Sequence, residues 1–300
     1  MRRYEIDWIR NISILMLFIY HTSAIICVFG DFYIISSQKN LLANLFIILM
    51  FVWYMPMLFF LAGASTYFAT KKRTFKEYLS ERKNKLLIPF LFGVLFLVPP
   101  QTYLARVWRG EYNLNYFEHL KYFFTTVTDF SGYDGAFSPA HLWFIIYLFI
   151  ISIIGEVIVF KVFKTENGMN ILNSLKIMLF NKFSFIILLI IGIIYTFFLR
   201  ESISASIIWF IDSLLKNIVL ICAINTIISF SSLYLNKDNS LLKYLNKSAF
   251  AVYIIHQPIL LTVAFIVVPL VKVTTVSMLL IILISLVLTF LALICYIFNT

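Results

Sequence analysis

Long apolar segments recur along the whole of this chain, and they constrain its fold more than any other feature. About 20 consecutive apolar residues are enough for a helix to cross the hydrocarbon core of a bilayer. Eight segments meet this length approximately: 8–29, 44–70, 86–104, 142–160, 183–199, 217–234, 248–268 and 276–298. Hydrophobic residues make up 62% of the 300 positions and charged residues 13%, far from the balance of a soluble domain. We therefore expect an all-α, polytopic membrane helix bundle, formed by one domain over residues 1–300.

The stretch 205–216 is harder to assign, because it is apolar but carries Asp212 and Lys216. These two residues are four apart, which is a helical pairing distance. We predict an interfacial or re-entrant piece on the outer face. Two alternatives are that it joins the following helix or forms a ninth span.

Basic residues gather in the short segments on one side of the apolar runs. With the N-terminus inside, 17 of the 24 Lys and Arg lie on the cytoplasmic side. Cytoplasmic loops of membrane proteins carry this excess, so we expect both termini in the cytoplasm. The same clustering accounts for the net charge of +10 without nucleic acid as a partner. The first apolar run is long and lacks a small-residue cleavage site, so we expect an uncleaved span rather than a signal peptide.

The cysteines and the known motifs exclude several kinds of site. Cys27, Cys222 and Cys295 all lie in apolar segments, and their spacing predicts neither a disulfide framework nor a metal site. The sequence carries no glycine-rich phosphate loop and no metal-ligand pair, so we expect no metal.

Three ionisable residues share one stripe of the first apolar segment. Arg10 and His21 are eleven residues apart, which is three helical turns plus about 20° and an axial distance of about 16 Å. Asp7 precedes Arg10 by three residues and lies on the same face. Ionisable groups inside a membrane are costly and usually mark a functional site. A buried imidazole can be a general base or a proton relay, which suits an enzyme and a proton-coupled transporter equally.

The other histidines have less distinctive surroundings. His141 begins one apolar segment, and His256 lies within another, two residues before Pro258. Each is either a hydrogen-bonded contact between helices or part of the site. His119 lies in the outer segment 105–140, which we expect to be a loop with this histidine solvated. The aromatic and acidic residues of that loop fit a sugar or an interfacial aromatic belt.

The cytoplasmic segment 71–85 is strongly basic. Such a segment either sets the topology and attracts anionic lipids or recognises a phosphate-rich cytosolic ligand. Arg82 and Lys85, one helical turn apart, have a spacing that could clamp phosphates.

Several blocks of the chain follow one another in a specific order. They are Arg-Arg-Tyr-Glu-Ile-Asp-Trp-Ile-Arg at 2–10, the arginine–ten residues–histidine motif of Arg10 and His21, Met-Pro-Met-Leu-Phe-Phe-Leu-Ala-Gly-Ala at 55–64, Arg-Lys-Asn-Lys-Leu-Leu-Ile-Pro at 82–89, Val-Pro-Pro-Gln-Thr-Tyr at 98–103, His-Leu-Trp-Phe at 141–144 and Ser-Ala-Phe-Ala-Val-Tyr-Ile-Ile-His-Gln-Pro at 248–258. Together these blocks resemble the membrane acyltransferase-3 family, most closely its branch with glucan-modifying acyltransferases.

The resemblance implies an activity and a set of site residues. The family moves an acyl group, commonly acetyl or succinyl, from cytosolic acyl-CoA to an extracytoplasmic acceptor, usually a carbohydrate hydroxyl. It implies that His21 is the catalytic residue and Arg10 its motif partner. With Asp7, which shares their stripe, these residues are our catalytic candidates. It places Arg82 and Lys85 at the acyl-CoA end, although the family often has arginine at both positions, and the two cations bind phosphate differently.

The resemblance also bears on the acceptor side and on the number of spans. The matching blocks make His141, Trp143, Tyr253 and His256 our substrate-binding candidates. Family members often show about ten spans, so up to ten transmembrane helices are expected. The implied partners are acyl-CoA, an extracytoplasmic glycan or other hydroxyl acceptor, and the lipid bilayer, in the plasma membrane of a bacterium. The alternatives are a proton-coupled transporter or carbohydrate exporter with the histidines as its relay, and a non-catalytic membrane subunit.

Overall fold

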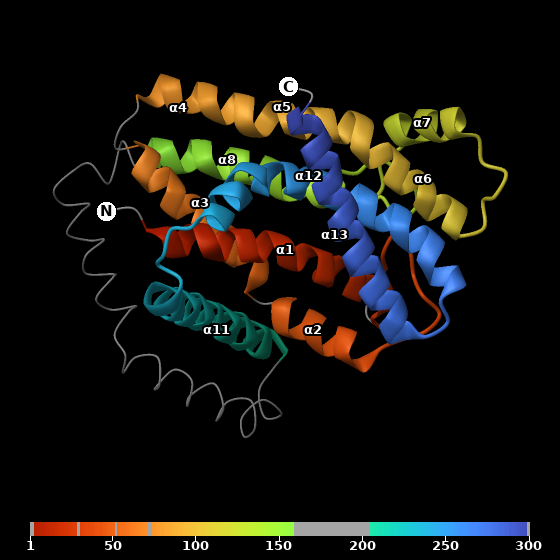
Figure 1. Ribbon diagram of the computed structural model, residues 1–300, viewed down its shortest axis with the longest axis horizontal. Coiled ribbons are helices and arrows are strands. Elements are labelled where there is room, and N and C mark those ends of the chain that lie inside the picture. Colours follow the sequence, from red (N-terminus) through yellow and green to blue (C-terminus); the bar gives the residue numbers. More distant parts are fainter. Residues whose placement is uncertain (1–2, 29–30, 52, 71–73, 159–204, 299–300) are drawn as a thin grey trace. The chain divides into compact units, whose positions relative to one another are not determined.

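The computed structural model describes residues 3–28, 31–51, 53–70, 74–158 and 205–298, and within these ranges every regular element is a helix (Figure 1). In chain order the helices are α1 (Tyr4–Ile26), α2 (Leu41–Phe51), α3 (Tyr54–Thr70), α4 (Phe75–Arg82), η1 (Lys83–Leu87), α5 (Ile88–Phe92), η2 (Gly93–Leu97), α6 (Val98–Trp108), α7 (Tyr116–Thr125), η3 (Ala140–Leu142), α8 (Trp143–Ile158), α11 (Ala205–Tyr234), α12 (Ser240–Leu270) and α13 (Thr274–Phe298). The predicted all-α class is confirmed.

Several of these helices are suited to span a membrane. In the described ranges, five are long and apolar enough: Tyr4–Ile26, Phe75–Trp108, Ile211–Tyr234, Ser240–Leu270 and Thr274–Ile294. The bent pair α2 and α3 makes a sixth if it counts as one span, and Ala140–Gly155 is a shorter apolar helix. The predicted span at 183–199 lies outside the described residues. The count of eight to ten spans and the cytoplasmic N-terminus therefore stay predictions.

Two segments differ from the leading sequence interpretation. The stretch 205–216 is the first part of the continuous helix α11, so it joins the following helix. The four-residue spacing of Asp212 and Lys216 is compatible with an uninterrupted helix. Part of the expected loop 105–140 forms helix α7, because the Asn115 side chain caps its first turn by accepting from the Phe117 N–H at 2.9 Å.

The chain divides into two compact units, which are described separately. The first unit comprises Met1–Ile9, Phe51–Phe75 and Ile151–Lys237. Its apolar core is built by α1, α3 and α11, from buried Ile9, Met57 and Leu61 and the partly buried side chains Ile6, Trp53, Ile224, Ile227 and Ile228. At its edge the Trp8 indole N–H donates to the Lys237 carbonyl at 3.1 Å.

The second unit comprises Arg10–Met50, Lys76–Ile150 and Asp238–Thr300, and it holds most of the candidate site residues. Within it α12 packs against α13 and α6, and α6 packs against α7. The helical stretch from η2 also approaches η3 closely, because a Cβ added at Gly93 would collide with Leu142. A side chain at position 93 would force the buried Leu142 side chain to shift.

Two π-helical turns interrupt the long helical stretch Phe75–Trp108. In η1 the Ile88 N–H bonds to the Lys83 carbonyl, and in η2 the Val98 N–H bonds to the Gly93 carbonyl, each five residues back. Each turn immediately precedes prolines, at position 89 and at positions 99 and 100. Because proline lacks an N–H and its ring crowds the preceding turn, a widened turn lets the helix continue past it.

Candidate functional site

Three histidines from distant parts of the sequence meet in the second unit. His21 comes from α1, His141 from η3 and His256 from α12. The ring centroids of His21 and His256 are 5.3 Å apart with the rings nearly stacked, and those of His141 and His256 are 5.2 Å apart and perpendicular. His141 is 7% exposed and His256 is fully buried. The three imidazoles therefore form one cluster, which we call the histidine cluster.

Backbone carbonyls orient two rings of the histidine cluster. The His141 Nε2 is 2.9 Å from the Ile254 carbonyl oxygen, and the His256 Nδ1 is 2.7 Å from the Tyr253 carbonyl oxygen. A carbonyl only accepts hydrogen bonds, so each of these nitrogens carries the hydrogen and the other nitrogen of a neutral ring presents a lone pair.

One nitrogen of each ring in the cluster is chemically available. Within the described part of the chain, His21 Nδ1, His141 Nδ1 and His256 Nε2 are buried without a hydrogen-bond partner. A buried polar atom left unpaired costs about 1–3 kcal/mol. Such atoms favour a ligand with hydroxyl or other polar groups, and a lone pair at a ring nitrogen can accept a hydroxyl proton.

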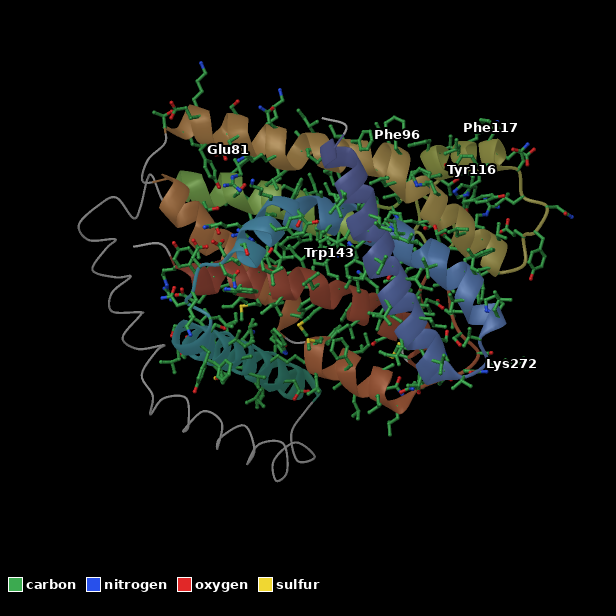
Figure 2. The ribbon with its side chains drawn as sticks, viewed as in Figure 1. Glu81, Phe96, Tyr116, Phe117, Trp143 and Lys272 are labelled. Carbon is green, nitrogen blue, oxygen red and sulfur yellow. The ribbon has the colours of Figure 1, made fainter. Side chains whose placement is uncertain are left out.

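Tyr253 ties α12 to the start of α8. Its hydroxyl donates to the backbone carbonyl of His141. Its ring centroid lies 5.8 Å from that of Phe144 and 5.9 Å from that of His256. Trp143, labelled in Figure 2, begins α8 two residues after His141. Ala140, just before His141, has a positive φ of 47°, a backbone conformation unusual for a residue with a side chain.

Two loops cover the end of α1 that carries His21. Phe32 of the 31–40 loop stacks on the His21 ring at 5.7 Å, and it also contacts Tyr133 of the 126–139 loop. The Arg109 guanidinium donates to the carbonyls of both Phe32 and Tyr133, and the Tyr33 hydroxyl donates to a carbonyl of the second loop. Burial raises the pKa of Tyr133. Arg109 and Tyr33 thus hold the two loops together beside the histidine cluster.

Arg10 is held at the other end of α1 by a residue of α12. The Arg10 Nη2 donates to the Asn246 Oδ1 at 2.8 Å, and the Asn11 Nδ2 donates to the same oxygen at 2.7 Å. Asn246 lies ten residues before His256 on α12, and Arg10 lies eleven residues before His21 on α1. The two spacings are nearly equal. Helices α1 and α12 therefore run side by side in the same direction. They are joined at two levels, by the hydrogen bonds to Asn246 and by the stacked rings of His21 and His256.

The structure brings some other candidates into local contacts. The Arg82 guanidinium lies over the Tyr78 ring at 4.8 Å, and the Lys85 Nζ is 2.7 Å from the Glu81 Oε1 (Glu81 is labelled in Figure 2). Lys85 belongs to the π-helical turn η1, so the two cations are not separated by a regular α-helical turn. Asp7 is partly buried on α1, one turn before Arg10, and belongs to the first unit.

His119 was expected to be solvated, and this expectation is wrong. The side chain is fully buried, and its Nε2 is 3.0 Å from both the Pro99 carbonyl and the Thr102 hydroxyl. Tyr116, labelled in Figure 2, lies 6.2 Å from the imidazole. Burial lowers the pKa of His119. These contacts join α7 to α6. The packing of α7 against α6 also removes the imidazole from water.

Sequence reasoning missed Asn246 and Phe32 as neighbours of the motif residues. An asparagine on the polar start of an apolar helix resembles any interfacial residue, and a phenylalanine in a loop carries no signal of its own. The described residues contain no group of three or more His, Cys, Asp and Glu placed to hold a metal ion.

A family model described as an acyltransferase domain, of the acyltransferase-3 type, matches residues 3–214. No curated protein and no solved structure matches the chain.

Proposed function

The chain belongs to the membrane acyltransferase-3 family and is an acyltransferase, and from this premise we propose a specific reaction for it. The proposed donor is cytosolic acyl-CoA, and the proposed acceptor is a carbohydrate hydroxyl outside the cytoplasm. Acetyl and succinyl are the proposed acyl groups. Its apolar helices make it a multi-pass membrane protein, and the bacterial plasma membrane is its proposed location.

One observation carries this proposal: the histidine cluster combines a family motif residue with two further imidazoles. His21 of the motif stacks on His256, which is perpendicular to His141. Each ring has a buried nitrogen with no hydrogen-bond partner among the described residues. An acyl transfer to an alcohol needs one group to take the hydroxyl proton and others to hold the sugar, and the cluster supplies both kinds.

The proposed reaction has two forms. In the first, His21 removes the proton of the acceptor hydroxyl, the oxygen bonds to the acyl carbon, the carbon–sulfur bond breaks and the proton passes to the departing thiolate. In the second, a His21 nitrogen bonds to the acyl carbon, the carbon–sulfur bond breaks and the thiolate takes the proton of the other ring nitrogen. The acceptor oxygen then bonds to the acyl carbon, the carbon–nitrogen bond breaks and the hydroxyl proton returns to the imidazole. In both forms CoA leaves as the thiol.

The other candidates have supporting parts in this proposal. His141, Trp143, Tyr253 and His256 bind the acceptor, with Tyr253 holding the His141 backbone. Arg82 and Lys85 meet the phosphates of acyl-CoA as it enters from the predicted cytoplasmic side. Asp7 and Arg10 complete the motif on α1.

The test measures transfer of radiolabel from acetyl-CoA or succinyl-CoA to a cell-envelope fraction, with purified protein in detergent. His21→Ala is expected to lower transfer by about 10²–10⁴-fold, the usual contribution of a general base. Ile12→Ala is the matched control, because Ile12 lies on the same helix with 39% of its surface exposed. Wild-type transfer in a folded His21→Ala variant would contradict the assignment. Proton-driven sugar uptake into proteoliposomes without acyl transfer would support the transporter instead.

A further inference from the structure

Phe32 covers the imidazole of His21 with an apolar ring. The two ring centroids are 5.7 Å apart, and the ring planes differ by 15°. Phe32 is 7% exposed, and the Nδ1 atom of His21 is buried. A phenyl ring is neither a conventional hydrogen-bond donor nor an acceptor, so Phe32 cannot hold the acceptor hydroxyl or take its proton. Its contribution to the site is the space that it fills beside His21.

Hydrogen bonds hold the loop that carries Phe32 in a fixed position. The Arg109 guanidinium donates to the Phe32 carbonyl at 3.1 Å, and the Trp108 indole N–H donates to the Ile35 carbonyl at 3.1 Å. The Ser36 N–H donates to a carbonyl in the last turn of α1 at 2.9 Å. The 31–40 loop is therefore attached to the end of α6 and to α1, the helix that carries His21.

Two tyrosines pack against Phe32. The ring centroids of Tyr33 and Tyr133 lie 5.4 Å and 6.1 Å from that of Phe32, and the two tyrosine rings are perpendicular at 5.0 Å. Tyr33 is 2% exposed, and its hydroxyl donates to the Ser131 carbonyl at 3.0 Å. We call Phe32, Tyr33 and Tyr133 the aromatic wall. Closely packed side chains leave few gaps large enough for a water molecule, so the wall limits the access of water on this side of His21.

Water competes with the acceptor in the proposed reaction. A base that takes the proton of a sugar hydroxyl can equally take a proton of water. The water oxygen would then bond to the acyl carbon, the carbon–sulfur bond would break and the proton would pass to the thiolate, which leaves a free carboxylic acid and CoA. In the predicted topology the 31–40 loop lies on the outer side, where water is abundant. Closed active sites prevent such losses by keeping water out.

We propose that Phe32 excludes water from His21, so that the acyl group passes to a sugar hydroxyl instead of being hydrolysed. This inference rests on the proposed function and deepens it by naming a residue that selects the acceptor. Phe32 is a positioning residue, because it acts through the surroundings of His21 and not on the acyl group itself.

The first test measures hydrolysis of acetyl-CoA by purified protein in detergent without an acceptor, as release of the free CoA thiol. Phe32→Ala is expected to raise this release by about tenfold over wild type, while transfer to a cell-envelope fraction does not rise. Phe32→Leu keeps an apolar side chain in the same space, so its release should stay within about threefold of wild type. The extra release in Phe32→Ala should disappear when His21→Ala is added, because water needs the same base.

Phe117→Ala is the matched control, because Phe117 is also a phenylalanine of the second unit but lies on α7 and is 78% exposed (Figure 2). Its release of CoA should equal that of wild type. Unfolding removes hydrolysis as well as transfer, so a gain in hydrolysis cannot come from a misfolded variant. In a preparation that transfers acetyl, unchanged release in Phe32→Ala would overturn the inference. A rise in transfer without a rise in hydrolysis would overturn it as well.

A chemical probe tests the shielding without acyl-CoA. Diethyl pyrocarbonate transfers its ethoxycarbonyl group to a neutral imidazole nitrogen that it can reach, and mass spectrometry of peptides gives the rate of labelling at His21. Phe32→Ala should raise this rate by about tenfold, whereas Phe32→Leu and Phe117→Ala should leave it unchanged. His119 is the internal reference, because it is fully buried and bonded to α6. An unchanged rate at His21, or an equal rise at His119, would overturn the shielding role.

The two tests separate this inference from the proposed function. If Phe32→Ala exposes His21 to the reagent while neither wild type nor variant uses acetyl-CoA, the shielding is supported and the proposed reaction fails. If wild-type protein transfers acetyl while Phe32→Ala changes neither hydrolysis nor labelling, the proposed function holds and this inference fails.

Discussion

Replacing Tyr253 by phenylalanine tests whether α12 positions the histidine cluster. The change removes one oxygen atom, which donates a hydrogen bond to the His141 carbonyl. Both residues are almost fully buried, with 5% and 7% of their surfaces exposed. Water therefore cannot readily replace the lost donor, and the carbonyl is left with one partner fewer. The expected loss is about 1–3 kcal/mol.

This loss should appear in catalysis, because of the two described hydrogen bonds between His141 and α12, the one from Nε2 to the Ile254 carbonyl is then left. If the whole amount is lost in the transition state, kcat/KM falls by about 5- to 150-fold. The assay is transfer of labelled acetyl from acetyl-CoA, measured alongside the thermal unfolding midpoint in detergent.

Tyr244→Phe is the matched control on the same helix, since Tyr244 is 38% exposed and stacks on Phe290. It should keep the wild-type kcat/KM. If Tyr253→Phe lowers the unfolding midpoint but keeps the wild-type kcat/KM, the hydrogen bond serves stability alone. That result would refute a positioning role for the Tyr253 hydroxyl.

Three further changes probe other parts of the second unit. Gly93→Ala should lower the free energy of unfolding by about 1–3 kcal/mol, because the added Cβ would collide with the Leu142 side chain. Gly63→Ala is the control and should be tolerated, because a Cβ at position 63 meets no atom within 4 Å. Thermal unfolding in detergent compares the two variants. Burial lowers the pKa of His119 in the folded protein below its ordinary value of about 6.5. As the pH falls through about 6.5, the unfolded chain therefore binds a proton at this residue before the folded one does, and the free energy of unfolding decreases. His119→Asn should therefore reduce the fall in unfolding midpoint between pH 7.5 and 5.5, and an unchanged fall would exclude His119 as its source. Arg109→Gln should free the 31–40 and 126–139 loops, so their backbone amides should exchange hydrogen about tenfold faster for each 1.4 kcal/mol lost.

The helices were predictable from sequence because the length of an apolar run is a local property. The run predicted at 276–298 corresponds to α13, Thr274–Phe298, and the run at 8–29 corresponds to α1, Tyr4–Ile26. His21 was also recognisable, since an ionisable group inside such a run has few structural reasons to be there. These features need no knowledge of which helices are neighbours.

The surroundings of His21 could not be predicted in the same way. His141 and His256 lie far along the chain, and only the packing of α12 and the start of α8 brings them beside His21. Asn246 is uncharged, so neither the charge pattern nor the hydropathy marks it as the partner of Arg10. His119 looked solvated because its burial depends on α7 packing against α6, which is a tertiary event.

The two-level attachment of α1 to α12 has an evolutionary consequence. Adding or deleting one residue between Arg10 and His21 would turn one of them by about 100° away from its partner. A compensating change between Asn246 and His256 would be needed at the same time, because both pairs must still meet. Relatives that keep both pairs should therefore vary in side chains along these two stretches but not in their lengths.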